Sequence, residues 1–273
     1  MANRSIVSDR VARIGKSAIH EMTRLSRDVE DVAFLSWAKP TSGTPEHINA
    51  GAVEAIRGGL CGGYSGNAGL PELAGVALEY NLAVITDEAY EYFTFDGHEH
   101  FSIGSIPEMR GRVISCYTFT KTYAMTGWRI GYLHADEELI PQITKAHIPL
   151  AICAPVVSQY AALAALKGPQ ECVAEFREHY RSMRDLMCER LDQLPHAFQY
   201  AKPSGSYLMF PRILLDEGRD SAAFCKKLLR EARVSTTPGS AFGPTGEGHL
   251  RLSFCVTEEE IDKAFDRMEQ YFG

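Results

Sequence analysis

The spacing of apolar residues predicts helices over long segments of the chain. Residues 5–27 have apolar side chains at helical spacing, and helical patterns dominate from 155 to 194. Residues 257–272 form a last amphipathic segment, in which Thr257 and Glu260 have the spacing of a capping box. These patterns predict helices that alternate with several short strands.

Short apolar runs between the helical segments predict those strands. They lie at residues 32–37, 82–87, 112–119, 129–134, 206–210 and 249–254. The run at 82–87 is almost continuously apolar, which is typical of a strand buried on both faces of a parallel sheet. The order of elements predicts an α/β fold with a mostly parallel core and a smaller α+β part.

Composition and charge narrow the class of protein. The chain has 273 residues, of which 45% are hydrophobic and 23% are charged, as in ordinary globular proteins. The net charge of -7 gives no electrostatic support for a nucleic acid or an anionic membrane as partner. Seven cysteines without a CxxC pair suggest neither a zinc knuckle nor a disulfide framework. With no apolar leader at the start, these features favour a cytoplasmic protein.

Hydroxyl groups, one lysine and one arginine gather after the predicted strand at 112–119. A lysine just beyond a buried strand is placed to lose solvent, which makes Lys121 a candidate Schiff-base nucleophile. Thr118, Thr120 and Arg129 would suit a phosphate, two as hydrogen-bond donors and one as a bidentate cation. From the residues alone, a surface lysine and an arginine in an ion pair remain the alternative.

The segment Thr-Phe-Thr-Lys-Thr-Tyr-Ala-Met-Thr-Gly-Trp-Arg-Ile-Gly-Tyr resembles the lysine motif of the class I and II aminotransferases. These are pyridoxal-phosphate enzymes of fold type I, and the likeness is to their aspartate aminotransferase-like branch. The resemblance implies that Lys121 forms the internal aldimine, and that Thr118, Thr120 and Arg129 hold the cofactor phosphate. The family more often has serine at the first two hydroxyl positions, and threonine keeps the donor.

The segment Ile-Thr-Asp-Glu-Ala-Tyr, which ends the strand at 82–87, supports the same resemblance. A carboxylate at the carboxyl end of a parallel strand lies where α/β folds bind ligands. Asp87 resembles the family's partner for the pyridine nitrogen, and Tyr90 resembles its phenol that bonds the ring hydroxyl. The alternative for a lone aspartate is a helix cap after a strand.

Two further segments resemble the family's substrate-binding parts. Arg251, on the strand at 249–254, resembles the arginine that grips the substrate carboxylate, a task that suits the guanidinium fork. Ala38 stands in a loop where the family usually has Gly-Glu-Pro or Gly-Gln-Pro, and Lys39 there changes the charge. Tyr64 resembles a residue that reaches across a homodimer to the partner's cofactor phosphate.

Two other polar or aromatic groups have a structural interpretation. The histidines and acids of 96–100 lie on a loop without metal-site spacing, and the aromatic residues of 206–210 are expected in the core. No metal site is therefore predicted.

The interval between Tyr64 and Asp87 is much shorter than in the family. Asp87 follows Tyr64 by only 23 positions, and a segment on the order of a hundred residues, the size of a small domain, is absent near residues 70–75. The absent segment carries several strands, a Gly-Ala phosphate turn, a ring that stacks on the pyridine and an Asn-Pro-Thr-Gly-like stretch. Losing it would expose sheet edges and weaken cofactor binding.

The resemblance implies a domain plan and an activity. Residues 1–44 would be part of the small domain, 45–165 an incomplete cofactor-binding large domain, and 166–273 the small carboxyl-terminal domain. The activity implied is transamination between an L-amino acid and a 2-oxo acid, impaired by the missing segment, in a homodimer. The alternatives are a β-lyase of the same fold, or a non-catalytic remnant or gene-model fragment.

Overall fold

The computed structural model describes residues 18–36, 43, 45–47, 49–50 and 72–273. They fall into two compact units. The first unit comprises Met1–Ala38, Met183–Pro203 and Leu208–Gly273, and the second comprises Lys39–Ser182 and Ser204–Tyr207. The domain boundaries expected after residues 44 and 165 stay a prediction.

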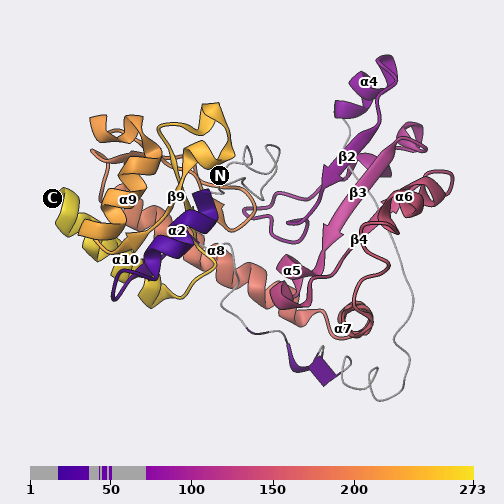
Figure 1. Ribbon diagram of the computed structural model, residues 1–273, viewed down its shortest axis with the longest axis horizontal. Coiled ribbons are helices and arrows are strands. Elements are labelled where there is room, and N and C mark those ends of the chain that lie inside the picture. The colour runs from indigo at the N-terminus through magenta and orange to yellow at the C-terminus, as the bar shows by residue number, and fades with distance from the viewer. Residues whose placement is uncertain (1–17, 37–42, 44, 48, 51–71) are drawn as a thin grey trace, which may run out of the picture. The chain divides into compact units, whose positions relative to one another are not determined.

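The second unit is built on a three-stranded sheet with the order β2-β3-β4 (Figure 1). Its strands are β2 (Val84–Asp87), β3 (Val113–Thr118) and β4 (Gly131–Ala135). Strands β2 and β3 are parallel, with Asp87 opposite Cys116, whereas β3 and β4 are antiparallel. The parallel pair brings the carboxyl ends of β2 and β3 to one edge of the sheet, and the predicted α/β class is confirmed.

Strand β2 is covered on one face only, so the expectation that residues 82–87 are buried on both faces is wrong. Val84 packs against a small cluster, whereas Ile85 is 72% exposed. The buried members of that cluster are Ala77, Ile103, Met109 and Val113. They come from α4 (Glu72–Glu79), two 3-10 turns and β3. In the described sheet β2 is an outer strand, and an apolar run cannot by itself report how many layers cover it.

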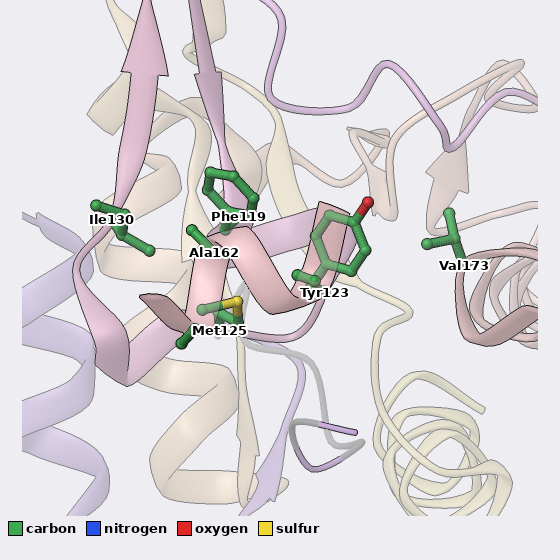
Figure 2. Close-up of a cluster of buried hydrophobic side chains, with 8 residues drawn as sticks. Phe119, Tyr123, Met125, Ile130, Ala162 and Val173 are labelled. Atoms are coloured by element: carbon green, nitrogen blue, oxygen red, sulfur yellow. The ribbon is translucent and has the colours of Figure 1, made fainter. Parts of the chain in front are cut away.

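A second apolar cluster holds the turn between β3 and β4 (Figure 2). The turn contains α5 (Phe119–Thr122) and a 3-10 turn, η3 (Thr126–Trp128). The buried members of the cluster are Phe119, Tyr123, Met125, Ile130, Ala161, Ala162, Ala165 and Val173. The alanines come from α7 (Val156–Lys167), and Val173 from the start of α8 (Glu171–Asp192). The helices predicted over 155–194 are thus confirmed, and α6 (Ile140–His147) precedes them.

The first unit combines short strands with amphipathic helices. Its strands pair as β1 (Ala33–Phe34) with β8 (Val234–Ser235), β10 (Leu250–Ser253) with β6 (Leu208–Met209) and β9 (Thr237–Pro238), and β5 (Phe198–Gln199) with β7 (Arg212–Ile213). Its helices are α2 (Ala18–Ser26), α9 (Ser221–Glu231), α10 (Glu258–Phe272) and the end of α8. Helix α10 buries Ile261, Phe265 and Met268, as its spacing predicts. Among the described residues, no helix has the length and apolar character needed to cross a membrane.

One of the two hydrogen bonds of the predicted capping box forms at the start of α10. The Thr257 hydroxyl accepts a hydrogen bond from the Glu260 backbone N–H, as a capping box requires. The Glu260 carboxylate accepts from the backbone N–H of Phe34. Glu260 therefore joins α10 to β1 rather than closing the box.

One arginine of the first unit is fully buried. Arg184, on α8, is 0% exposed, and its guanidinium contacts the Asp185 carboxylate at 2.8 Å and the Pro203 carbonyl at 3.0 Å. Asp185 also pairs with Lys202 at 2.8 Å. These contacts join α8 to the segment at 202–203 and compensate the desolvated charge.

Candidate active site

Lys121 lies on α5, the single helical turn that follows β3. The Thr118 hydroxyl caps this turn by accepting a hydrogen bond from the Thr120 backbone N–H at 3.1 Å. Thr120 is buried, whereas Thr118 and Lys121 are half-buried. Burial of Phe119 and Tyr123 on either side fixes the turn and directs Lys121 away from their cluster.

Arg129 lies where the same turn returns to β4. It is exposed and has a left-handed backbone with φ 50°, which is uncommon outside glycine. Its guanidinium donates to the Thr126 carbonyl at 2.8 Å. The neighbouring Ile130 carbonyl accepts from the Phe119 N–H at 3.3 Å, so Arg129 is held near the end of β3. Thr118, Thr120 and Arg129 thus belong to one turn.

Asp87 ends β2 beside β3 and is exposed. Its carboxylate accepts a hydrogen bond from the Ala89 N–H at 3.2 Å, which orders the turn that leads to Tyr90. The next residue, Glu88, is buried and contacts His100 Nε2 at 3.0 Å. One histidine of the loop at 96–100 therefore has a structural partner. Within the described ranges, no group of three histidine, cysteine or acidic residues could hold a metal.

An aromatic residue that the sequence interpretation placed in the core also contacts the lysine. Lys121 Nζ lies 5.4 Å from the ring centre of Tyr207 and 5.9 Å from that of Tyr90. The two rings pack edge to face, with centres 5.1 Å apart. Tyr207 and Met209 are 0% exposed, which confirms the core interpretation for them, whereas Phe210 is 42% exposed.

Backbone pairing brings Tyr207 to this position. The Ser206 N–H donates to the Phe93 carbonyl at 2.8 Å, and Gly205 bridges Thr94. A Cβ at Gly205 would lie 3.1 Å from the Phe93 carbonyl oxygen, so glycine suits this close approach. The signal in the sequence is a glycine two residues before an aromatic residue, which is too weak to predict the contact.

Glu91 is a second residue that the sequence interpretation missed. It lies in the turn after β2, and Thr122 Oγ1 donates to its Oε1 at 3.4 Å. Burial, with help from the carboxylates of Glu88 and Asp87, raises the pKa of Glu91 to about 7. A pattern of residue types could not reveal this, because the pKa depends on what covers the side chain.

The remaining predicted site residues lie elsewhere. Arg251 belongs to the first unit, on β10, where its guanidinium donates to the Ser36 carbonyl at 3.2 Å and lies 4.9 Å from the ring centre of Phe242. Ala38 and Tyr64 lie outside the described residues. The structure therefore brings together the predicted residues of β2, α5 and the turn to β4, and describes Arg251 separately.

Fold and site together define the class of protein. A lysine directly after a strand, with a carboxylate ending the neighbouring parallel strand, is the arrangement of fold type I pyridoxal-phosphate enzymes. The family model described as aminotransferase class I and II matches residues 61–268. The chain belongs to this family.

Two curated relatives are similar over the same part of the chain. One is aromatic-amino-acid aminotransferase 2 of Thermococcus litoralis, which is 39% identical over 203 residues, 74% of this chain and 51% of the relative. The other is an aspartate aminotransferase of Pyrococcus abyssi, which is 40% identical over the same shares of both chains. The chain thus spans about half the length of the curated relatives it matches.

Solved structures share the fold. The crystal structure of Pyrococcus protein-A1 has a TM-score of 0.88 at 27% identity, covering 97% of this chain and 98% of that chain. An aromatic aminotransferase from Pyrococcus horikoshii has a TM-score of 0.80 at 27% identity, over 92% of this chain and 98% of that chain. These likenesses support the predicted fold type I architecture.

The groups present fit pyridoxal phosphate, the cofactor of this family. The Asp87 carboxylate is exposed at a strand end, where it can accept a hydrogen bond from a pyridine N–H. The hydroxyls and guanidinium of the turn after β3 suit a phosphate, and the Lys121 amine lies near the rings of Tyr90 and Tyr207. The residues thus match the chemistry of the group at its ring nitrogen, its phosphate and its reactive carbon.

Proposed function

We propose that this protein catalyses pyridoxal-phosphate-dependent transamination between an L-amino acid and a 2-oxo acid. The observation that carries the proposal is the placement of Lys121, on the family's motif, after β3 and beside the strand end that bears Asp87. The names of the relatives suggest aspartate and aromatic amino acids as the first donors to test.

The proposal assigns a role to each predicted side chain. Pyridoxal phosphate, when bound, supplies the electron sink for charge that develops on the substrate's α carbon. Lys121 would attach the cofactor through Nζ and move the proton at that carbon. Asp87 would accept a hydrogen bond from the pyridine nitrogen, and Tyr90 would donate one to the ring hydroxyl.

The remaining residues would bind charged groups. Thr118, Thr120 and Arg129 would hold the phosphate, and Arg251 would pair with the substrate carboxylate. Ala38 would line the substrate loop, and Tyr64 would contact the phosphate across a homodimer. We also propose that the protein is located in the cytoplasm.

We also infer that the short interval before Asp87 weakens the activity. The chain spans about half of its relatives, and a binding site needs its whole set of contacts to act efficiently. We therefore expect low affinity for pyridoxal phosphate and slow turnover compared with a full-length relative.

The test is to add pyridoxal phosphate to the purified protein and to Lys121→Ala. We expect visible absorbance that is lost in Lys121→Ala and retained in Lys167→Ala, an exposed lysine of α7 in the same unit. Keto-acid formation from aspartate or an aromatic amino acid then tests transamination. A folded protein that stays colourless would overturn the proposal, and release of pyruvate and ammonia from cysteine would indicate a β-lyase.

A further inference from the structure

One side-chain contact joins the two parts of the candidate site. Glu91 lies in the turn that follows β2 and contains Tyr90, and its backbone N–H donates to the Glu88 carbonyl at 3.3 Å. The Thr122 hydroxyl, on α5, donates to Glu91 Oε1 at 3.4 Å. Because Thr122 directly follows Lys121, this contact links the turn after β2 to the helix that presents the lysine.

The contact lies in a largely buried environment. Thr122 is 2% exposed, and Glu91 is half-buried. The second carboxyl oxygen of Glu91, Oε2, is buried and has no hydrogen-bond partner among the described residues. A buried carboxyl with an unsatisfied oxygen is costly when ionised, so this environment favours the neutral form of Glu91.

Several other titratable groups interact with Glu91. Asp87 ends β2 and Glu88 follows it, and both disfavour the ionised form of Glu91. Tyr92, Tyr123 and Tyr132 interact electrostatically with Glu91, and burial raises the pKa of each tyrosine above its ordinary value of 10.0. These phenols therefore stay neutral near pH 7, where Glu91 itself titrates.

We infer that Glu91 is a positioning residue for Lys121, and that gain or loss of its proton changes how α5 presents the lysine amine. The ionised carboxylate accepts a stronger, charge-assisted hydrogen bond from Thr122 than the neutral acid does. It also places a negative charge beside α5, which favours the ammonium form of a neighbouring lysine. The inference rests on the proposed function only for the reaction that the Lys121 amine carries out.

The test follows the reactivity of Lys121 without any cofactor. Formaldehyde with cyanoborohydride methylates lysines in the full chain between pH 5.5 and 8.5, and peptide mass spectrometry gives the rate ratio of Lys121 to exposed Lys167. We expect this ratio to fall by roughly threefold between pH 6 and 8, because ionised Glu91 disfavours the neutral, reactive form of the amine.

Two variants separate the charge from the hydrogen bond. Glu91→Gln keeps the shape of the side chain but cannot ionise, so its ratio should not change with pH. Thr122→Val removes the hydroxyl, which holds the pKa of Glu91 down, so the midpoint should move to higher pH. Glu108→Gln, an exposed glutamate of the same unit, and His100→Asn, which removes an imidazole that contacts Glu88, should both keep the profile of the wild-type protein.

Three outcomes would overturn the inference. They are a constant ratio in the wild-type protein, the wild-type profile in Glu91→Gln, or an unmoved midpoint in Thr122→Val. The first needs no variant, so the test stands even if a variant does not fold. The probe is formaldehyde, so the methylation test does not need pyridoxal phosphate. Failure to bind pyridoxal phosphate would overturn the proposed function without affecting the test of Glu91.

Discussion

The buried carboxyl of Glu91 makes the stability of the second unit depend on pH. Its pKa rises from an ordinary 4.5 in the unfolded chain to about 7 in the folded protein, chiefly through burial. The folded state therefore holds more protons than the unfolded state between these values, and stability decreases as the pH rises from 4.5 to about 7. Below this window the carboxyl is neutral in both states, and above it the full cost of ionisation is present.

The size of the effect follows from the same two values. Each pKa unit corresponds to about 1.4 kcal/mol, so the full cost of ionising Glu91 is about 3 kcal/mol. Between pH 5 and pH 8, about 2.5 kcal/mol of it appears. In Glu91→Gln the side chain stays neutral and can still accept from Thr122. We expect this variant to match the wild-type protein at pH 5 to within about 1 kcal/mol and to exceed its stability by about 3 kcal/mol at pH 8.

Urea unfolding at the two pH values measures this difference. The chain has two tryptophans, and Trp128 belongs to the second unit, so its fluorescence in a Trp37→Phe background reports on that unit. Glu108→Gln, in which an exposed carboxyl is lost, is the matched control and should show the pH dependence of the wild-type protein. If Glu91→Gln were no more stable than the wild-type protein at pH 8, the assigned burial and pKa of Glu91 would be refuted.

Three further predictions concern packing. Arg184→Met should lower the free energy of unfolding by about 2 kcal/mol, because it removes a fully buried guanidinium that donates to the Pro203 carbonyl and pairs with Asp185. Arg181→Met, at a half-buried residue of the same helix whose ion pair with Glu178 is largely exposed, should cost less than about 1 kcal/mol, with both variants measured by urea unfolding followed by far-UV circular dichroism. Gly131→Ala should cost about 1–3 kcal/mol in thermal unfolding, because its Cβ would lie 2.5 Å from the Tyr117 carbonyl oxygen. Gly127→Ala is the control and should be mild, because a Cβ there would meet nothing within 4 Å. Ile85→Thr should change stability by less than about 0.5 kcal/mol, and a loss as large as that of a core isoleucine would contradict its exposure.

Local chemistry in the sequence predicts the lysine-bearing turn. The hydroxyl of Thr118 is a good helix cap, and the apolar residues Phe119, Tyr123 and Ile130 can be buried only if the chain turns back at this point. The strand before the turn and the strand after it are short apolar runs. These signals act over few residues, so the sequence alone placed Lys121 directly after a strand.

Tertiary structure decided which distant groups meet that lysine. Tyr207 lies 86 residues further along the chain, and it contacts Lys121 because backbone pairing at Phe93 holds its segment in the second unit. No local pattern specifies such a pairing, because its energy comes from hydrogen bonds and burial between segments far apart in sequence.

Burial shows the same division between sequence and tertiary structure. The run at 82–87 predicts a strand, and β2 forms there, but Ile85 is exposed because a sheet face is covered only where another layer packs on it. The sequence pattern made no prediction for Glu91, and its pKa is raised because neighbouring segments remove water from it. The sequence thus determined the elements and the reactive motif, while solvent exposure and protonation were decided by contacts that exist only in the folded chain.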